Sequence, residues 1–100
     1  MANSVPSFLA HKQGDHVAVA VKDVDPGPAE VGFLDGGDPV TVEVAAPIPL
    51  GHKVALQDVS SGEDVIEYGV RTAIASADIT RGDYVHIHNV RSARWQNSVA

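Results

Sequence analysis

Short apolar runs along the chain are separated by glycine, proline and aspartate, and the runs have the period of a β-strand. Residues 40–44 (VTVEV) alternate between apolar and polar positions, and residues 16–21 (HVAVAV) are apolar everywhere except at the histidine. Both patterns predict strands. A turn followed by a strand is predicted for each of three further segments, 47–59, 60–69 and 82–90.

Turn residues occupy most of the remaining chain. The segments 23–30 (DVDPGPAE) and 33–39 (FLDGGDP) have turn composition, and Asp35-Gly36-Gly37 is a candidate hairpin tip. Residues 70–79 (VRTAIASADI) are compatible with either a strand or a short helical turn. Because no segment carries a clear helical period with caps, the chain is predicted to form a small all-β domain.

Composition narrows the class of protein. One hundred residues indicate one domain, and a net charge of −6 argues against nucleic-acid binding, which needs a basic surface. The absence of cysteine excludes disulfides and thiolate metal sites. No apolar run approaches the ~20 residues that cross a bilayer, and the first residues lack the pattern of a signal peptide. We therefore expect no membrane association and a cytoplasmic location.

A weak internal repeat joins two parts of the chain. Residues 48–56 and residues 79–87 both read I-x-x-G-x-x-V-x-(L/I), and shorter matches follow Gly14 and Gly62. The repeated unit is a turn glycine followed by a half-buried strand. Two such units are expected to pack around one core with approximate two-fold symmetry, unless the match reflects only the high valine content.

The first candidate for chemistry is the pair His86 and His88 within GDYVHIHNV. On a strand, positions i and i+2 share a face, so both imidazoles would project from the face opposite Val85 and Ile87. Two neutral imidazoles on one face can ligate a transition metal. The alternative is the solvated face of an ordinary strand.

The second candidate is LGHKV, in which Gly51 permits a tight turn immediately before His52 and Lys53. Lysine offers a point charge for a carboxylate, sulfonate or phosphate, and histidine offers proton transfer near neutral pH. The alternative is a polar surface turn. No phosphate loop, nucleophile elbow or EF-hand pattern is present, so a self-contained catalytic site is difficult to build from this chain.

Taken together, three segments resemble one family: HKQGDHVAVAVKDV, PLGHKVALQDVSSGEDVIEYG and ADITRGDYVHIHNV. They are similar to the small N-terminal module of the altronate/galactarate dehydratase family, a SAF-type (antifreeze-like) domain with a β-clip fold. The resemblance covers residues 8–91, which leaves residues 1–7 as an expected flexible tail. Residues 92–100, with one tryptophan, form a second tail that is a candidate for docking to a partner.

The resemblance implies a lyase subunit. Members of the family are sugar-acid dehydratases or, in one branch, (R)-sulfolactate sulfo-lyases, and the ending HNVRSARW is more similar to that branch. A separate small module of this kind implies a large catalytic subunit, a small anionic hydroxy-acid substrate and a principal base on the large subunit. The isolated chain is then expected to be inactive, and assembly into a homo-oligomer stays open.

The resemblance also assigns roles to residues. His52, His86 and His88 are the expected catalytic residues, and Lys53, Asn89 and Arg71 the expected substrate-binding residues. His86 and His88 would help to hold a divalent metal such as Fe²⁺, which the large subunit would mainly bind. The alternative function is a non-catalytic β-clip module that binds a carbohydrate, a metal or a protein partner, and a plainer one is a structural domain with incidental histidines.

Overall fold

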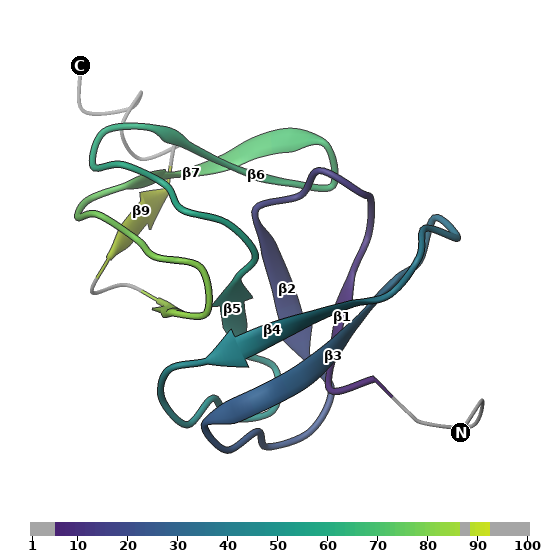
Figure 1. The fold of residues 1–100 in the computed structure, drawn as a ribbon. Helices are drawn as coiled ribbons and strands as arrows, with labels where there is room; N and C mark the ends of the chain where they lie inside the picture. Colours follow the sequence, from purple (N-terminus) through teal and green to yellow (C-terminus); the bar gives the residue numbers. More distant parts are fainter. Residues whose placement is uncertain (1–5, 87–88, 93–100) are drawn as a thin grey trace.

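Two β-sheets make up the part of the chain that the computed structural model describes, residues 6–86 and 89–92 (Figure 1). No helix occurs in these residues, which confirms the predicted all-β class. The strands are β1 (Phe8–Ala10), β2 (Val17–Ala20), β3 (Gly27–Phe33), β4 (Val40–Val44), β5 (Lys53–Ala55), β6 (Asp64–Glu67), β7 (Val70–Ala75), β8 (Tyr84–Val85) and β9 (Val90–Ser92).

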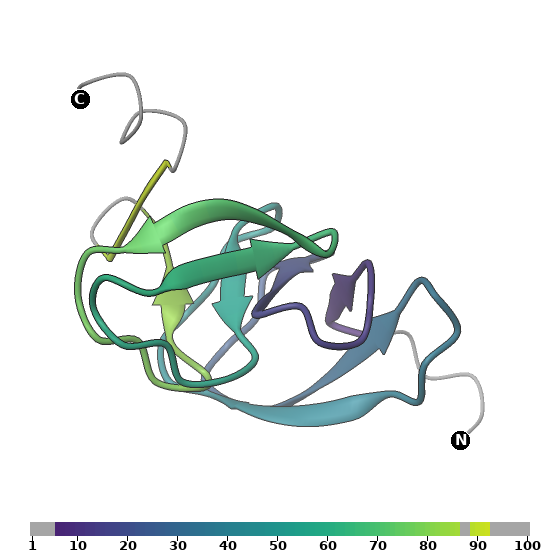
Figure 2. The same ribbon diagram turned by 90° about the horizontal axis from the view of Figure 1, so that it is seen from above.

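The larger sheet has the strand order β4-β3-β1-β2-β5-β8, and the smaller one has the order β6-β7-β9. Strands β1 and β3 are parallel, whereas the other paired strands are antiparallel. Strands β2 and β5 lie between the β3–β4 hairpin and the β6–β7 hairpin, as the two views agree (Figures 1 and 2). The larger sheet therefore curls between two layers.

Two apolar clusters hold these layers together, and β2 and β5 contribute to both. Ala18 and Val54 belong to a cluster that is centred on Phe8 and the β3–β4 hairpin. Val17 and Ala55 belong to a second cluster that faces β6 and β7. Successive side chains of a strand point to opposite faces, so a strand between two cores is apolar at every position. This explains the apolar run over β2, Val17–Ala20.

The internal repeat is confirmed by the backbone. Gly51 and Gly82 both have a positive φ, 84° and 94°, which is the region that glycine adopts without strain. Each glycine N–H donates to the carbonyl of the last residue of a neighbouring strand: Gly51 to Ala20 of β2 and Gly82 to Ala55 of β5, both at 2.8 Å. The two units then continue into β5 and β8, which pair with each other.

The residue three positions before each glycine forms an isolated bridge to an earlier valine. Ile48 exchanges two backbone hydrogen bonds with Val24, and Ile79 exchanges two with Val59. Residues 59–65 (VSSGEDV) are a third copy of the unit, with Gly62 at a φ of 90°. Within the sequence, only the second half of this copy had been matched to the repeat, because Val59 stands where the other two copies have isoleucine.

Some segments differ from the sequence-based expectation. The strand predicted within residues 82–90 is shorter than expected: β8 ends at Val85, and the N–H groups of Asn89 and Val90 donate to the carbonyl of His86. The expected turn over residues 23–30 ends early, since β3 begins at Gly27.

Residues 70–79, for which the sequence allowed either a strand or a helical turn, contain the strand β7.

The short strand β1 was not expected. It lies at the centre of the larger sheet, and Phe8 is fully buried. Next to β1, the backbone of Ser7 forms hydrogen bonds with Glu30 and Val21. Residues 1–5 of the predicted tail lie outside the described part.

A buried carboxylate fixes the turn between β6 and β7. Asp15 is 4% exposed and accepts hydrogen bonds from the backbone N–H groups of Lys12, Tyr68 and Gly69. Tyr68 has a positive φ of 60° and stacks on His11. The turn that follows Glu67 is thereby tied to the loop that precedes β2.

Candidate functional site

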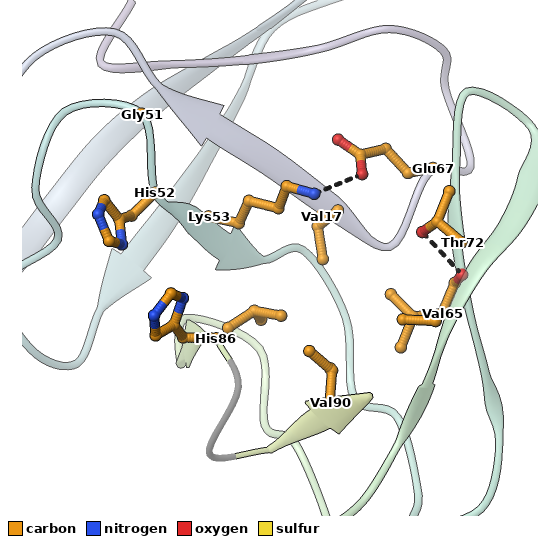
Figure 3. Close-up of a pocket in the computed structure, with 11 residues that line it drawn as sticks. Val17, Gly51, His52, Lys53, Val65, Glu67, Thr72, His86 and Val90 are labelled. Atoms are coloured by element: carbon orange, nitrogen blue, oxygen red, sulfur yellow. Dashed lines mark hydrogen bonds and ion pairs between the residues drawn. The ribbon is translucent and has the colours of Figure 1, made fainter. Parts of the chain in front are cut away.

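A pocket of about 380 Å³ opens where the two sheets meet (Figure 3). One part of its wall is polar and comes from the ends of β5, β6 and β8, and the remainder is largely valine and alanine. The lining residues are Val17, Gly51, His52, Lys53, Val65, Glu67, Thr72, Ala73, Val85, His86 and Val90.

The G-H-K element reaches this pocket because of its turn. The N–H of His52 donates to the carbonyl of Pro49 at 3.0 Å, and its carbonyl accepts from Ala20 at 2.7 Å. Lys53 is the first residue of β5, and its partner on β8 is Val85. The tight turn and the short strand therefore place His52 and Lys53 beside the end of β8.

His52 and His86 form a cluster with Tyr84. The centroids of the two imidazole rings are 5.1 Å apart (Figure 3). The hydroxyl of Tyr84 is hydrogen bonded to Nδ1 of His52 at 2.5 Å. The ring of Tyr84 stacks on that of His86, with an interplanar angle of 6° and a centroid distance of 5.5 Å. These three rings come from two copies of the internal repeat, which the fold brings together.

Asn89 stabilises the turn that carries His86. Its side chain is buried, with 6% of the residue exposed. Its Oδ1 accepts from the N–H of His86 at 2.9 Å, and its Nδ2 donates to the carbonyl of Tyr84 at 2.8 Å. The amide thus bridges the two residues that flank Val85 and does not line the pocket. This arrangement gives Asn89 a role in positioning His86.

On the far side of the pocket, Lys53 forms an ion pair with Glu67. The Nζ and Oε1 atoms are 2.7 Å apart (Figure 3). The side chain of Glu67 is only 6% exposed, whereas that of Lys53 is 40% exposed. A buried carboxylate needs such a partner, because burial of an unpaired charge is costly. The pair also neutralises the positive charge of Lys53.

Sequence reasoning missed Glu67 and Tyr84. Glu67 shares a strand face with the buried Val65, since they are two positions apart on β6. That spacing was a usable signal for an acid that points inward. Tyr84 lies two positions before His86, so the same spacing places both side chains on one strand face. Its contact with His52 has no local signal, because it joins residues 32 positions apart.

The other predicted residues are placed as follows. Arg71 is exposed and forms an ion pair with Asp64 at 3.6 Å, and it does not line the pocket. His88 lies outside the described residues, so its pairing with His86 stays a prediction. The described residues contain no group of three or more histidine, aspartate or glutamate side chains that could hold a metal ion.

A family model for the SAF domain of altronate/galactarate dehydratases matches residues 6–93. The chain belongs to this family. The match confirms the predicted SAF-type fold and covers the described pocket. It begins two residues before the predicted domain and ends two residues after it.

Curated relatives agree with the family match. The chain is 37% identical to the (2R)-sulfolactate sulfo-lyase subunit alpha of Chromohalobacter salexigens over 90 residues, which is 88% of this chain and 96% of the relative. It is 42% identical to the subunit alpha of Paracoccus pantotrophus over 50 residues, or 50% of this chain and 75% of the relative.

The Altronate dehydratase of Escherichia coli is 42% identical over 78 residues, which is 78% of this chain. The SAF domain spans only 15% of that relative. The homologues are therefore lyases and dehydratases, in which a domain of this kind is either a small subunit or a small part of a longer chain. Within the described residues, no helix is long and apolar enough to cross a membrane.

Proposed function

We propose that this SAF domain is the small subunit of a two-component lyase that eliminates sulfite or water from a small hydroxy acid. One observation carries the proposal. On a chain that matches 96% of a sulfo-lyase subunit alpha, two imidazoles and an ammonium group line one pocket. The site residues in this proposal are His52, His86 and Lys53.

The proposed chemistry follows from these side chains. Removal of the proton next to a substrate carboxylate develops negative charge on oxygen, and fixed donors stabilise that charge. His52 and His86 can each donate from an imidazole nitrogen. Lys53 has three N–H donors, and its 40% exposed side chain leaves room for an acidic group of the substrate beside Glu67.

The lack of net positive charge in the pocket supports the proposal that a second subunit helps to bind the anionic substrate. The ion pair of Lys53 and Glu67 is neutral as a whole, and the chain carries a net charge of −6. An anionic substrate therefore gains little electrostatic attraction from this chain alone. Additional positive charge and the principal base are assigned to the large subunit. A cytoplasmic location stays a prediction.

A divalent metal such as Fe²⁺ would also depend on the large subunit. Of the two predicted metal ligands, His86 and His88, the first lines the pocket, and transition metals accept an imidazole nitrogen as a donor. Since the described residues offer no group of three side chains of the usual ligand types, the further ligands would have to come from outside them. When bound, such an ion would act as a Lewis acid on a substrate oxygen.

The test is reconstitution with a large dehydratase-type chain encoded beside this one. Release of sulfite from (2R)-sulfolactate and loss of water from altronate are measured separately, with each chain alone and with both together. We expect turnover of one substrate only when both chains are present. The variant His86→Ala should abolish turnover, while His11→Ala, which changes a histidine that does not line the pocket, should preserve it.

Two outcomes would contradict the proposal: full turnover by the large chain alone, or normal turnover with His86→Ala. The alternative function, a non-catalytic binding module, predicts that the isolated chain binds a carbohydrate, metal or protein tightly and never supports turnover. Calorimetric titration of the isolated chain with the two substrates distinguishes these functions, because the lyase proposal predicts weak binding without the large chain.

A further inference from the structure

We infer that Tyr84 is a positioning residue that holds His52 in the tautomer protonated at Nε2. In this tautomer, neutral His52 is a hydrogen-bond donor to a ligand and cannot accept a proton at Nε2. The inference deepens the proposed function, on which its consequence for the reaction rests. The tautomer itself is a property of this chain and can be measured without a partner.

The first step is that Tyr84 is itself held in place. It is a residue of β8 paired with Val54 of β5, which is fully buried. Its ring is half-buried and packs against the apolar cluster centred on Phe8. In addition, its carbonyl accepts a hydrogen bond from Asn89. A well-held part of the larger sheet therefore places the phenol beside His52, which lines the pocket.

The second step concerns the hydrogen bond between the Tyr84 hydroxyl and Nδ1 of His52. A phenol oxygen shares its lone pairs with the ring, so a phenolic hydroxyl donates better than it accepts. Donation requires Nδ1 to be unprotonated. In neutral imidazole one nitrogen carries the proton and the other accepts, so the proton of His52 is then on Nε2. The bond made by one ring nitrogen sets the state of the other.

The third step is the division of roles in the pocket. A neutral His52 with its proton on Nε2 can stabilise negative charge that develops on a substrate oxygen. It cannot at the same time remove a proton through that nitrogen. Proton abstraction is then left to His86 or to the large subunit. On this inference His52 acts as a hydrogen-bond donor, whereas the sequence motif suggested proton transfer.

The fourth step is that one ring supports both imidazoles. The stack of Tyr84 on His86 depends on the aromatic ring, whereas the bond to His52 depends on the hydroxyl. Tyr84→Phe removes only the hydroxyl and preserves the ring. The variant therefore isolates the tautomer effect from the support of His86. Tyr68→Phe is a matched control, since Tyr68 is exposed and stacks on a different histidine.

The experiment is long-range ¹H–¹⁵N NMR of the imidazole nitrogens in the full ¹⁵N-labelled chain, at a pH where its histidines are neutral. His52→Gln identifies the signals of His52 by their loss. We expect wild-type His52 to show Nδ1 and Nε2 shifts that are far apart, with the proton on Nε2. Tyr84→Phe should bring these shifts closer as the second tautomer becomes populated, and Tyr68→Phe should leave them unchanged.

A proton on Nδ1 in the wild type, or identical His52 shifts in wild type and Tyr84→Phe, would overturn the inference. The wild-type measurement decides the tautomer even if a variant folds poorly. In the reconstituted enzyme, Tyr84→Phe should lower kcat about three- to ten-fold, the range for loss of one hydrogen bond, with KM little changed. If wild type has no turnover with the large chain, the proposed function fails while the NMR result still judges the inference.

Discussion

The ion pair of Lys53 and Glu67 makes an asymmetric prediction about stability. Lys53→Met leaves the carboxylate of Glu67 without its partner at 6% exposure. Glu67→Gln leaves an ammonium group on a side chain that is 40% exposed and can turn towards water. Because burial of an unpaired charge is the costly event, Lys53→Met should be the more destabilising substitution.

The magnitudes follow from these exposures. Removal of one partner from a buried pair costs about 3–5 kcal/mol, and the open pocket beside Glu67 places Lys53→Met at the lower end, about 3 kcal/mol. Glu67→Gln also breaks the ion pair, but the ammonium group of Lys53 stays hydrated, so the free energy of unfolding falls by only about 1 kcal/mol. In a domain of this size each kcal/mol lowers Tm by roughly 4–8 °C. The two variants should therefore differ in Tm by about 10 °C.

The assay is equilibrium urea unfolding of the isolated chain, analysed with the double variant to complete a thermodynamic cycle. The double variant should be more stable than Lys53→Met alone, because the buried charge is then absent. A Lys53→Met variant no less stable than Glu67→Gln would refute the reasoning. It would show that Glu67 has access to water in the absence of Lys53.

Three further predictions concern turns of the fold. Gly82→Ala should lower the free energy of unfolding in urea by about 2 kcal/mol more than Gly62→Ala. Both glycines have a φ near 90°, but only at Gly82 would a Cβ lie 2.0 Å from the carbonyl oxygen of Glu43. Equal losses in the two variants would contradict the prediction. Asn89→Ala should lower the free energy of unfolding by about 1–3 kcal/mol, because the hydrogen bonds of the Asn89 side chain to the backbone of Tyr84 and His86 are lost. The imidazole NMR signals of His86 should also shift. Unchanged signals would contradict the positioning role of Asn89. The pKa of Asp35 is lowered from 3.8, chiefly by hydrogen bonds from the backbone N–H groups of Gln13 and then Gly37. The ionised carboxylate of Asp35 therefore stabilises the folded state above its unfolded-state pKa, and this stabilisation is lost as pH falls through the lower folded-state pKa. The difference in free energy of unfolding between wild type and Asp35→Asn should narrow over that pH range. A difference that stays constant would contradict the prediction.

Much of the fold follows from local pattern. Alternation located β4, and the continuous apolar run located β2, because the side-chain period of a strand is independent of what it packs against. Turn composition located the hairpin between β3 and β4. The weak repeat was also informative, since glycines at a positive φ recur where the same turn recurs.

Local pattern failed where hydrogen bonds across the chain decide the conformation. The alternation in residues 82–90 is that of a strand, yet the buried amide of Asn89 bonds to the backbone of Tyr84 and His86 and closes a turn there. The short β1 contains too few residues to show a period. It is a strand because β2 and β3 pair with it on both sides.

The candidate site likewise combines residues that local pattern predicts with contacts that only the tertiary structure creates. By itself, the sequence determined the all-β class, the family and three pocket residues, His52, Lys53 and His86, because turn chemistry and short motifs are local properties. Only the tertiary structure decided that His86 lies beside His52, that Tyr84 bonds to one and stacks on the other, and that Glu67 neutralises Lys53. Apart from the stack of Tyr84 on His86, these contacts join residues 14 to 34 positions apart, and their geometry is set by how the strands and sheets pack, which no local pattern encodes.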